Sequence, residues 1–127
     1  MKIRIAMWSG PRNISTAMMR SFGGRADTFV SDEPFYGAYL KQSGEPQPMA
    51  DAIIADMDCD WHSVAETMRG PVPDGSAFWY QKHMPHHMID AVSIREYLLH
   101  SSCIFRPFSW AMDYYALPDS KRDYSTI

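Results

Sequence analysis

The stretch that most constrains this chain lies near its N-terminus, where an apolar run leads into a Gly-Pro turn. The run covers Ile3 to Trp8, and the turn continues as Ser-Gly-Pro-Arg-Asn-Ile-Ser-Thr over residues 9–16. A nearly continuous apolar run is typical of a parallel strand covered on both faces. Apolar residues at helical spacing follow, at positions 14, 17, 18 and 22. The pattern predicts a strand, a tight loop and a helix in succession.

A loop that joins a strand to a helix in this way is suited to binding an anion. Backbone N–H groups and the positive end of the helix dipole point at one place. Arg12 adds a positively charged guanidinium group whose geometry fits phosphate or sulfate, and Ser15 and Thr16 add hydroxyl donors. We expect the loop to hold an anionic cofactor through Gly10, Pro11, Arg12, Asn13, Ile14, Ser15 and Thr16. The structural alternative is an ordinary turn in which Ser15 and Thr16 only cap the helix.

The loop does not match the Walker A phosphate loop. Counted from Gly10, the pattern GxxxxGK[ST] requires Gly, Lys and Ser or Thr at positions where the chain has Ser15, Thr16 and Ala17. The lysine and the magnesium-binding hydroxyl are therefore missing, which argues against ATP or GTP hydrolysis. A cradle that needs no metal ion fits the sequence better.

Strands and helices are expected to alternate along the rest of the chain. Apolar segments predict further strands at residues 28–30, 77–80 and 102–105. Helices are predicted at about 15–22, 35–42, 49–57, 61–69 and 86–100, and Asp60 is a plausible N-cap of the fourth. This order predicts an α/β fold, a three-layer sandwich around a short parallel sheet, like a P-loop nucleotide-binding domain. Residues 1–106 are assigned to this domain and residues 107–127 to a divergent C-terminal tail, where no clean period continues.

Composition limits the class of protein. A chain of 127 residues provides one domain, and its 46% hydrophobic and 21% charged fractions are ordinary for a soluble one. No run approaches the ~20 apolar residues of a membrane span, and the start reads as that of the mature protein. The net charge of −3 disfavours a general nucleic-acid binder. We expect neither a nucleic acid nor a membrane as partner, and the sequence leaves the oligomeric state open.

Cysteine usage points to a reducing compartment. The chain has two cysteines, Cys59 and Cys103, with neither a CxxC pair nor metal-ligand spacing. Reduced thiols in a cytoplasmic protein are the expectation. The three histidines His83, His86 and His87 follow no spacing that closes a metal site. We therefore expect no metal.

Side chains capable of chemistry follow each of the four predicted strands. Arg12 follows the first, Asp32 and Glu33 the second, Lys82 and His83 the third, and Arg106 the fourth. In doubly wound sheets, ligands gather outside the carboxyl ends of the strands. An arginine or lysine after one strand is more often a solvated loop residue, so the argument rests on the coincidence of all four.

Glu33 and His83 are the candidates for a general base. A carboxyl group at the mouth of a cleft has its pKa raised by partial burial, and an imidazole takes a proton near neutral pH. For Glu33 the structural alternative is an ion pair with Arg12 or a cap on the helix that begins near Phe35.

Three motifs resemble those of the sulfotransferase superfamily. Residues 8–16, in the bacterial form W-S-G-P-R-N-I-S-T, resemble the loop that holds the 5′-phosphosulfate group in that superfamily. Asp32-Glu33-Pro34-Phe35 is similar to an acidic-Pro-Phe motif after the second strand of bacterial members. Residues 81–85 look like the K-x-H-[LM]-P segment that carries the catalytic histidine of cytosolic members. The motifs occur in the order found in the superfamily, over roughly residues 3–106.

The resemblance implies transfer of a sulfuryl group from 3′-phosphoadenosine 5′-phosphosulfate to a hydroxyl or amine of a small-molecule acceptor. By position, Arg12 would steady the phosphosulfate bridge, and Asn13, Ser15 and Thr16 would hold the 5′-phosphate. Arg106 would also bind the co-substrate. Such a reaction needs in-line positioning and positive charge, without a metal or a covalent intermediate.

The resemblance also implies the catalytic roles. Glu33 or His83 would be the base, and Lys82 would offset charge that develops on the sulfuryl oxygens.

The C-terminal part of the sequence departs from the pattern of the superfamily. Arg106 is followed directly by Pro107, without the family's Asp between them, and Tyr114 stands where the family has a serine. The family's glycine-rich basic closing segment is also missing. This predicts a shortened, incomplete copy. A non-catalytic nucleotide-binding remnant is therefore an alternative function, and a magnesium-dependent small-molecule kinase is a third.

Overall fold

The apolar run near the N-terminus forms a central strand, β1 (Ile3–Trp8), of a four-stranded sheet. The computed structural model of this chain describes residues 2–10, 14–88 and 103–105. The other strands are β2 (Thr28–Asp32), β3 (Phe78–His83) and β4 (Cys103–Phe105), and the order across the sheet is β2-β3-β1-β4. All three pairings are parallel.

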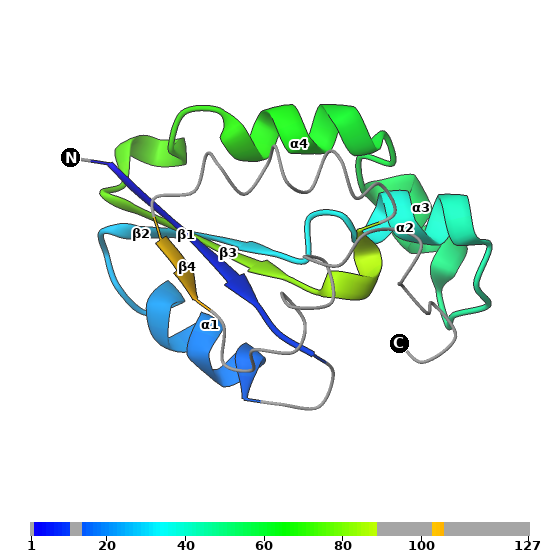
Figure 1. Ribbon diagram of the computed structural model, residues 1–127, viewed down its shortest axis with the longest axis horizontal. Coiled ribbons are helices and arrows are strands. Elements are labelled where there is room, and N and C mark those ends of the chain that lie inside the picture. The colour runs from blue at the N-terminus through cyan, green and yellow to red at the C-terminus, as the bar shows by residue number, and fades with distance from the viewer. Residues whose placement is uncertain (1, 11–13, 89–102, 106–127) are drawn as a thin grey trace, which may run out of the picture.

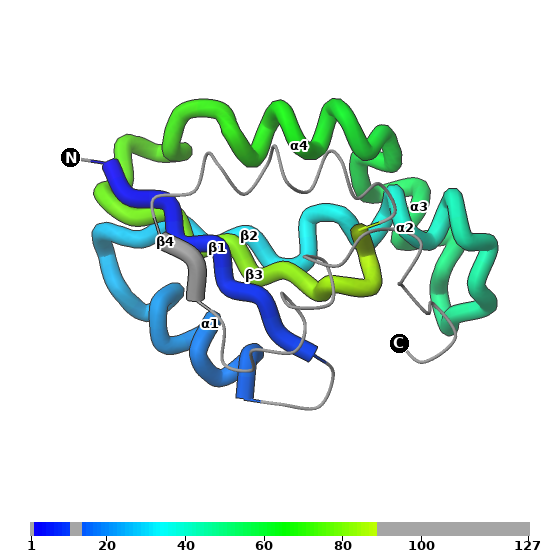
Figure 2. Tube along the Cα trace, viewed as in Figure 1, coloured from blue at the N-terminus to red at the C-terminus, as the bar shows by residue number. Residues whose placement is uncertain are grey.

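Helices cover both faces of this sheet. Figure 1 shows α1 (Ser15–Gly23) on one face and α4 (Trp61–Arg69) on the other. In Figure 2, α2 (Tyr36–Ser43) and α3 (Ala50–Asp56) pack together toward the carboxyl ends of the strands. Two short 3₁₀ turns, η1 (Pro73–Gly75) and η2 (Pro85–His87), flank β3. The predicted α/β sandwich of three layers around a short parallel sheet is therefore confirmed.

The α4 face of the sheet carries the hydrophobic core. The buried residues of α4 are Trp61, Val64, Ala65 and Met68, spaced i, i+3, i+4 and i+7 as an amphipathic helix requires. Asp60 caps the helix, because its side chain accepts hydrogen bonds from the backbone N–H groups of the second and third helical residues. The cap and the apolar face predicted for this helix are both confirmed.

The α1 face is packed more sparsely than expected. Phe22 of α1 stacks on Tyr80 of β3 with their ring centroids 4.3 Å apart. Ile14, however, is 69% exposed, because α1 begins one residue later and Ile14 occupies the N-cap position. Ala17 is exposed as well. The sequence interpretation that placed these two residues on an apolar helix face was wrong.

Two strands run further than their apolar segments. β2 continues through Asp32, and β3 continues through Lys82 and His83, which were expected to follow the strands. The reason is the parallel ladder, in which Lys82 pairs with both Met7 and Asp32, so polar residues join the sheet. The predicted helices at 35–42 and 49–57 correspond to α2 and α3, and the fourth strand is confirmed as β4.

The predicted helix at 86–100 falls mostly outside the described residues, and residues 85–87 form η2. Within the described residues, no helix combines the length and the apolar character that crossing a membrane requires. Cys59 is a free thiol, whose Sγ donates to the carbonyl oxygens of Ile54 and Met57 at 3.4 Å each.

Candidate functional site

The carboxyl end of β1 lies where the order of the sheet reverses. β3 pairs with one side of β1 and β4 with the other, so the loop after β1 follows a topological switch point. In Figure 1, α1 runs back along the sheet, which brings its N-terminus to the same edge. Ser9 and Gly10 are buried there, and the Ser9 N–H donates to the His83 carbonyl at 3.1 Å. The end of the strand and the start of the helix predicted around residues 9–16 thus lie at the edge where ligands bind in such sheets.

The N-terminus of α1 has no side-chain cap. Ile14 is the N-cap residue, and no side chain there accepts a hydrogen bond from the first turn. Ser15 is buried and Thr16 is exposed, and both are helical residues, so they do not fill the capping position that the structural alternative gave them. The first turn also contains no acidic residue. Within the described residues, the positive end of α1 thus carries neither a capping side chain nor an acidic residue, which favours a negatively charged group there.

Four of the predicted cofactor residues cannot be placed. Pro11, Arg12, Asn13 and Arg106 lie outside the described residues. Their roles stay predictions.

Lys82 is the central charge of the site. It is 5% exposed, and its Nζ donates to Asp32 Oδ1 at 3.0 Å and to Glu33 Oε1 at 2.7 Å. Burial lowers the pKa of Lys82, but the hydrogen bonds to Glu33 and Asp32 outweigh it and leave the pKa above its usual value. Lys82 is therefore an ammonium ion held between two carboxylates.

Glu33 is fixed by its backbone as well as by Lys82. Its φ angle of 47° places it in the left-handed region, directly after β2. Its N–H donates to the Lys82 carbonyl, and its own carbonyl accepts from the Tyr36 N–H, both at 3.0 Å. Its side chain remains 26% exposed. Glu33 is thus a positioned carboxylate that solvent reaches, and the partner that the structure gives it is Lys82.

His83 lies on the opposite face of the sheet from Lys82. Successive side chains of a strand point to opposite faces, so Gln81 and His83 share one face and Lys82 lies on the other. Gln81 donates to the Met68 carbonyl of α4 at 2.9 Å, which places Gln81 and His83 on the α4 face. The His83 ring is 1% exposed and stacks on Trp8 with the centroids 4.7 Å apart. Burial, with a smaller contribution from His87, lowers the pKa of His83 to about 3. The structure therefore brings together Asp32, Glu33 and Lys82, and buries His83 as a neutral side chain in the core.

A cluster of tyrosines and histidines near this edge was missed from the sequence. η2 packs on α2, where the His87 ring lies 4.9 Å from the Tyr36 ring and 5.1 Å from the Tyr39 ring. The ring of His86 lies 4.4 Å from that of His87. Burial, together with nearby positive charge, lowers the pKa of His87 to about 3. The signal was available, since two tyrosines three residues apart share one face of a helix.

Metal binding has no geometric support in the part of the chain that the structure describes, where no three His, Cys, Asp or Glu side chains gather closely enough to hold an ion. The arrangement that is present can do two things. It can attract an oxyanion at the N-terminus of α1, and it can accept a proton on Glu33, the carboxylate that solvent reaches.

Comparison with known proteins points to a family. The sequence matches the Sulfotransferase domain family over residues 2–123. Two similar curated proteins, both from Arabidopsis thaliana, are Branched-chain-amino-acid aminotransferase-like protein 2 and protein 1. They are 44% and 42% identical to this chain over 62 residues, which are 49% of the chain but 11% of each relative. No solved structure matches the chain.

Proposed function

This chain belongs to the sulfotransferase domain family, and from that premise we propose that it transfers a sulfuryl group from 3′-phosphoadenosine 5′-phosphosulfate to a small molecule. The accepting group is a hydroxyl or an amine. The observation that carries the proposal is Lys82, a nearly buried ammonium ion placed between Asp32 and Glu33 at the carboxyl edge of the sheet. A reaction that moves a sulfuryl group to a hydroxyl or an amine needs positive charge and a base at one place.

The donor's 5′-phosphosulfate group would lie at the N-terminus of α1. Gly10, Ile14, Ser15 and Thr16 would surround it. This placement is supported by the N-cap residue Ile14, whose hydrocarbon side chain accepts no hydrogen bond from the helix N–H groups. In this proposal Arg12 and Asn13 contact the phosphosulfate, and Arg106 binds the nucleotide.

The reaction is a direct displacement at sulfur. The acceptor oxygen or nitrogen forms a bond to sulfur while the bond from sulfur to the 5′-phosphate oxygen breaks, and adenosine 3′,5′-bisphosphate leaves. The proton of the acceptor passes to a carboxylate, and Lys82 offsets the charge on the sulfuryl oxygens. Glu33 and His83 are both proposed as the base, and the geometry favours Glu33. It lies on the same side of the sheet as Lys82 and is reached by solvent, whereas His83 is buried on the other face.

The proposal is tested by mixing the full chain with donor labelled at sulfur and a set of phenols, alcohols and amines. Release of adenosine 3′,5′-bisphosphate with transfer of the label is the expected result. Glu33→Gln should abolish transfer but leave donor affinity within about twofold, because the lost group acts on the proton rather than on the donor. Glu66→Gln removes an exposed carboxylate of α4 and serves as the matched control.

Two outcomes would contradict this function, and a third would contradict only the assignment of the base. Donor that binds but never loses its sulfuryl group to any acceptor supports the non-catalytic remnant. ATP binding that requires magnesium supports a kinase. Wild-type transfer in both Glu33→Gln and His83→Ala removes both candidate bases.

A further inference from the structure

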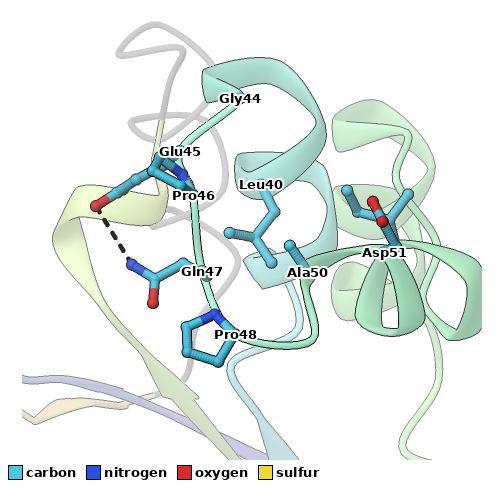
Figure 3. A pocket seen from close by; sticks show the side chains of 9 residues that line it. Leu40, Gly44, Glu45, Pro46, Gln47, Pro48, Ala50 and Asp51 are labelled. Carbon is cyan, nitrogen blue, oxygen red and sulfur yellow. Dashed lines mark hydrogen bonds between the residues drawn. The ribbon is translucent and has the colours of Figure 1, made fainter.

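A pocket of about 450 Å³ lies between the end of α2, the loop over residues 44–48 and the start of α3. Figure 3 shows Leu40 of α2 and Ala50 of α3 between the two helices, with the loop beside them. Asp51 follows Ala50 on α3. Its lining residues are Leu40, Gly44, Glu45, Pro46, Gln47, Pro48, Ala50, Asp51 and Ile54. The volume falls in the range of small-molecule sites, which is roughly 300–1,000 Å³. None of the described residues discussed above as catalytic or donor-binding lines it.

The walls of the pocket are apolar and stiff. Leu40 is 2% exposed, and Ile54 and Ala50 add further apolar surface from α3. Two prolines, Pro46 and Pro48, restrict the φ angles of the loop wall. A wall that is fixed before binding loses little conformational entropy when a ligand enters. The pocket therefore suits the apolar body of a small molecule.

The charge that lines the pocket is negative. Among the described residues that line it, Glu45 and Asp51 are ionisable, and none is a lysine, arginine or histidine. The Glu45 carboxylate accepts from Gln47 Nε2 at 3.3 Å and from the Tyr39 hydroxyl, one bond at each oxygen. A carboxylate has about four acceptor positions, so Glu45 retains the capacity to accept from an ammonium group.

Tyr39 joins the pocket to the site at the edge of the sheet. Its hydroxyl donates to Glu45, and its ring lies 5.5 Å from that of His86 and 5.1 Å from that of His87. Glu33 and Glu45 both act on His86 by charge, and Lys82 acts on His87. Ring contacts thus lead from the pocket through Tyr39 to His86 and His87, and these two rings lie within electrostatic range of Glu33 and Lys82.

We infer that this pocket binds the positively charged end of the acceptor, an ammonium group on a short apolar body. That the bound molecule is the acceptor rests on the proposed function, whereas binding of an ammonium compound in the pocket does not. The negative charge of Glu45 and Asp51 attracts the ammonium group, and the body packs on Leu40 and Ile54.

Binding is tested on the full chain by titrating hexylammonium, hexanol and hexanoate and following backbone amide signals by NMR. We expect shifts at residues 44–51 and tightest binding for hexylammonium, by about fivefold over hexanol at low salt, with hexanoate weakest. The double variant Glu45→Gln/Asp51→Asn should remove this preference but leave hexanol affinity within about twofold, because the apolar walls are intact. The control Glu66→Gln/Asp74→Asn makes the same change of charge at exposed positions outside the pocket.

Equal binding of hexylammonium and hexanoate would overturn the inference, as would shifts that avoid residues 44–51 or an equal loss in the control variant.

The role as acceptor site is tested with labelled donor and two alcohols, 6-aminohexanol and hexanol. We expect a KM about fivefold lower for 6-aminohexanol, and loss of that difference in Glu45→Gln/Asp51→Asn. Equal KM values in the unmodified chain would refute the assignment to the acceptor. A chain that fails to bind adenosine 3′,5′-bisphosphate and transfers to neither alcohol counts against the proposed function instead, and the binding titration still decides the pocket.

Discussion

Removing the partners of Lys82 is expected to destabilise the protein more than removing Lys82 itself. The lysine side chain is 6% exposed, whereas that of Glu33 is 26% and that of Asp32 is 53% exposed. A hydrogen bond to a charged group contributes about 1.5–3 kcal/mol when buried, and an exposed ion pair about 0.2–1 kcal/mol. We therefore expect about 3 kcal/mol of lost unfolding free energy in Asp32→Asn/Glu33→Gln, which leaves a buried ammonium ion without a counter-charge.

Lys82→Met should cost less than about 1 kcal/mol, because a methionine fills the same space without charge and both carboxylates then reach water. Urea denaturation followed by circular dichroism measures both variants at pH 7. The pairing raises the pKa of Lys82, so its stabilisation is complete below the ordinary pKa of 10.5 and is lost as the pH rises through the higher value of the folded state. The wild type and the double variant should therefore converge in strongly alkaline solution. A cost for Lys82→Met equal to that of the double variant would refute the reasoning.

Three further predictions concern the scaffold. Gly37→Ala should lower the unfolding free energy by about 1–3 kcal/mol in thermal melts, because a Cβ there would stand 2.7 Å from Met57 Cβ. Asp60→Ala should cost about 1 kcal/mol through loss of the α4 cap, measured in the same way. The imidazole NMR signals of His83 and His87 should stay those of neutral rings between pH 8 and 5, since burial lowers both pKa values to about 3.

The histidines also affect stability in acid. A histidine whose folded-state pKa lies below its unfolded value of 6.5 stabilises fully above pH 6.5, and that stabilisation falls as the pH drops toward 3. Each such histidine adds up to about 1.4 kcal/mol per pH unit to this loss of unfolding free energy. A flat stability profile from pH 7 to 4 would contradict the burial of both rings.

Gly24→Ala, whose Cβ would make only ordinary contacts, is the control for Gly37→Ala, and equal losses of unfolding free energy would contradict the steric argument.

Local patterns predicted the elements of this fold where one face of an element is apolar. α4 is the clearest case, because its four buried residues and its Asp60 cap are all visible in a nine-residue window. β1 and β4 were equally readable from short apolar runs. The start of α1 was predicted correctly near Ser15, but the apolar spacing through Ile14 and Ala17 did not give a buried face, because both residues are exposed.

The candidate site was predictable in part. The carboxyl ends of parallel strands share one edge, so the meeting of Glu33 with Lys82 followed from topology. The placement of Lys82 and His83 on opposite faces of the sheet was not predicted. The predicted strand ended at Tyr80, so the alternation of faces was not applied to the residues that follow it. The polar end of β3 belongs to the sheet only through its ladders with β1 and β2. The contact of Gly37 with Met57 joins segments 20 positions apart and has no local signal.

The most direct test of the central claim is isothermal titration calorimetry of the full chain with adenosine 3′,5′-bisphosphate, without metal ions. The account predicts saturable binding that Thr16→Glu weakens, because a negative side chain in the first turn of α1 would compete with the phosphate. Glu66→Gln should leave the affinity unchanged. Absence of heat with the bisphosphate, together with magnesium-dependent binding of ATP, would contradict the account.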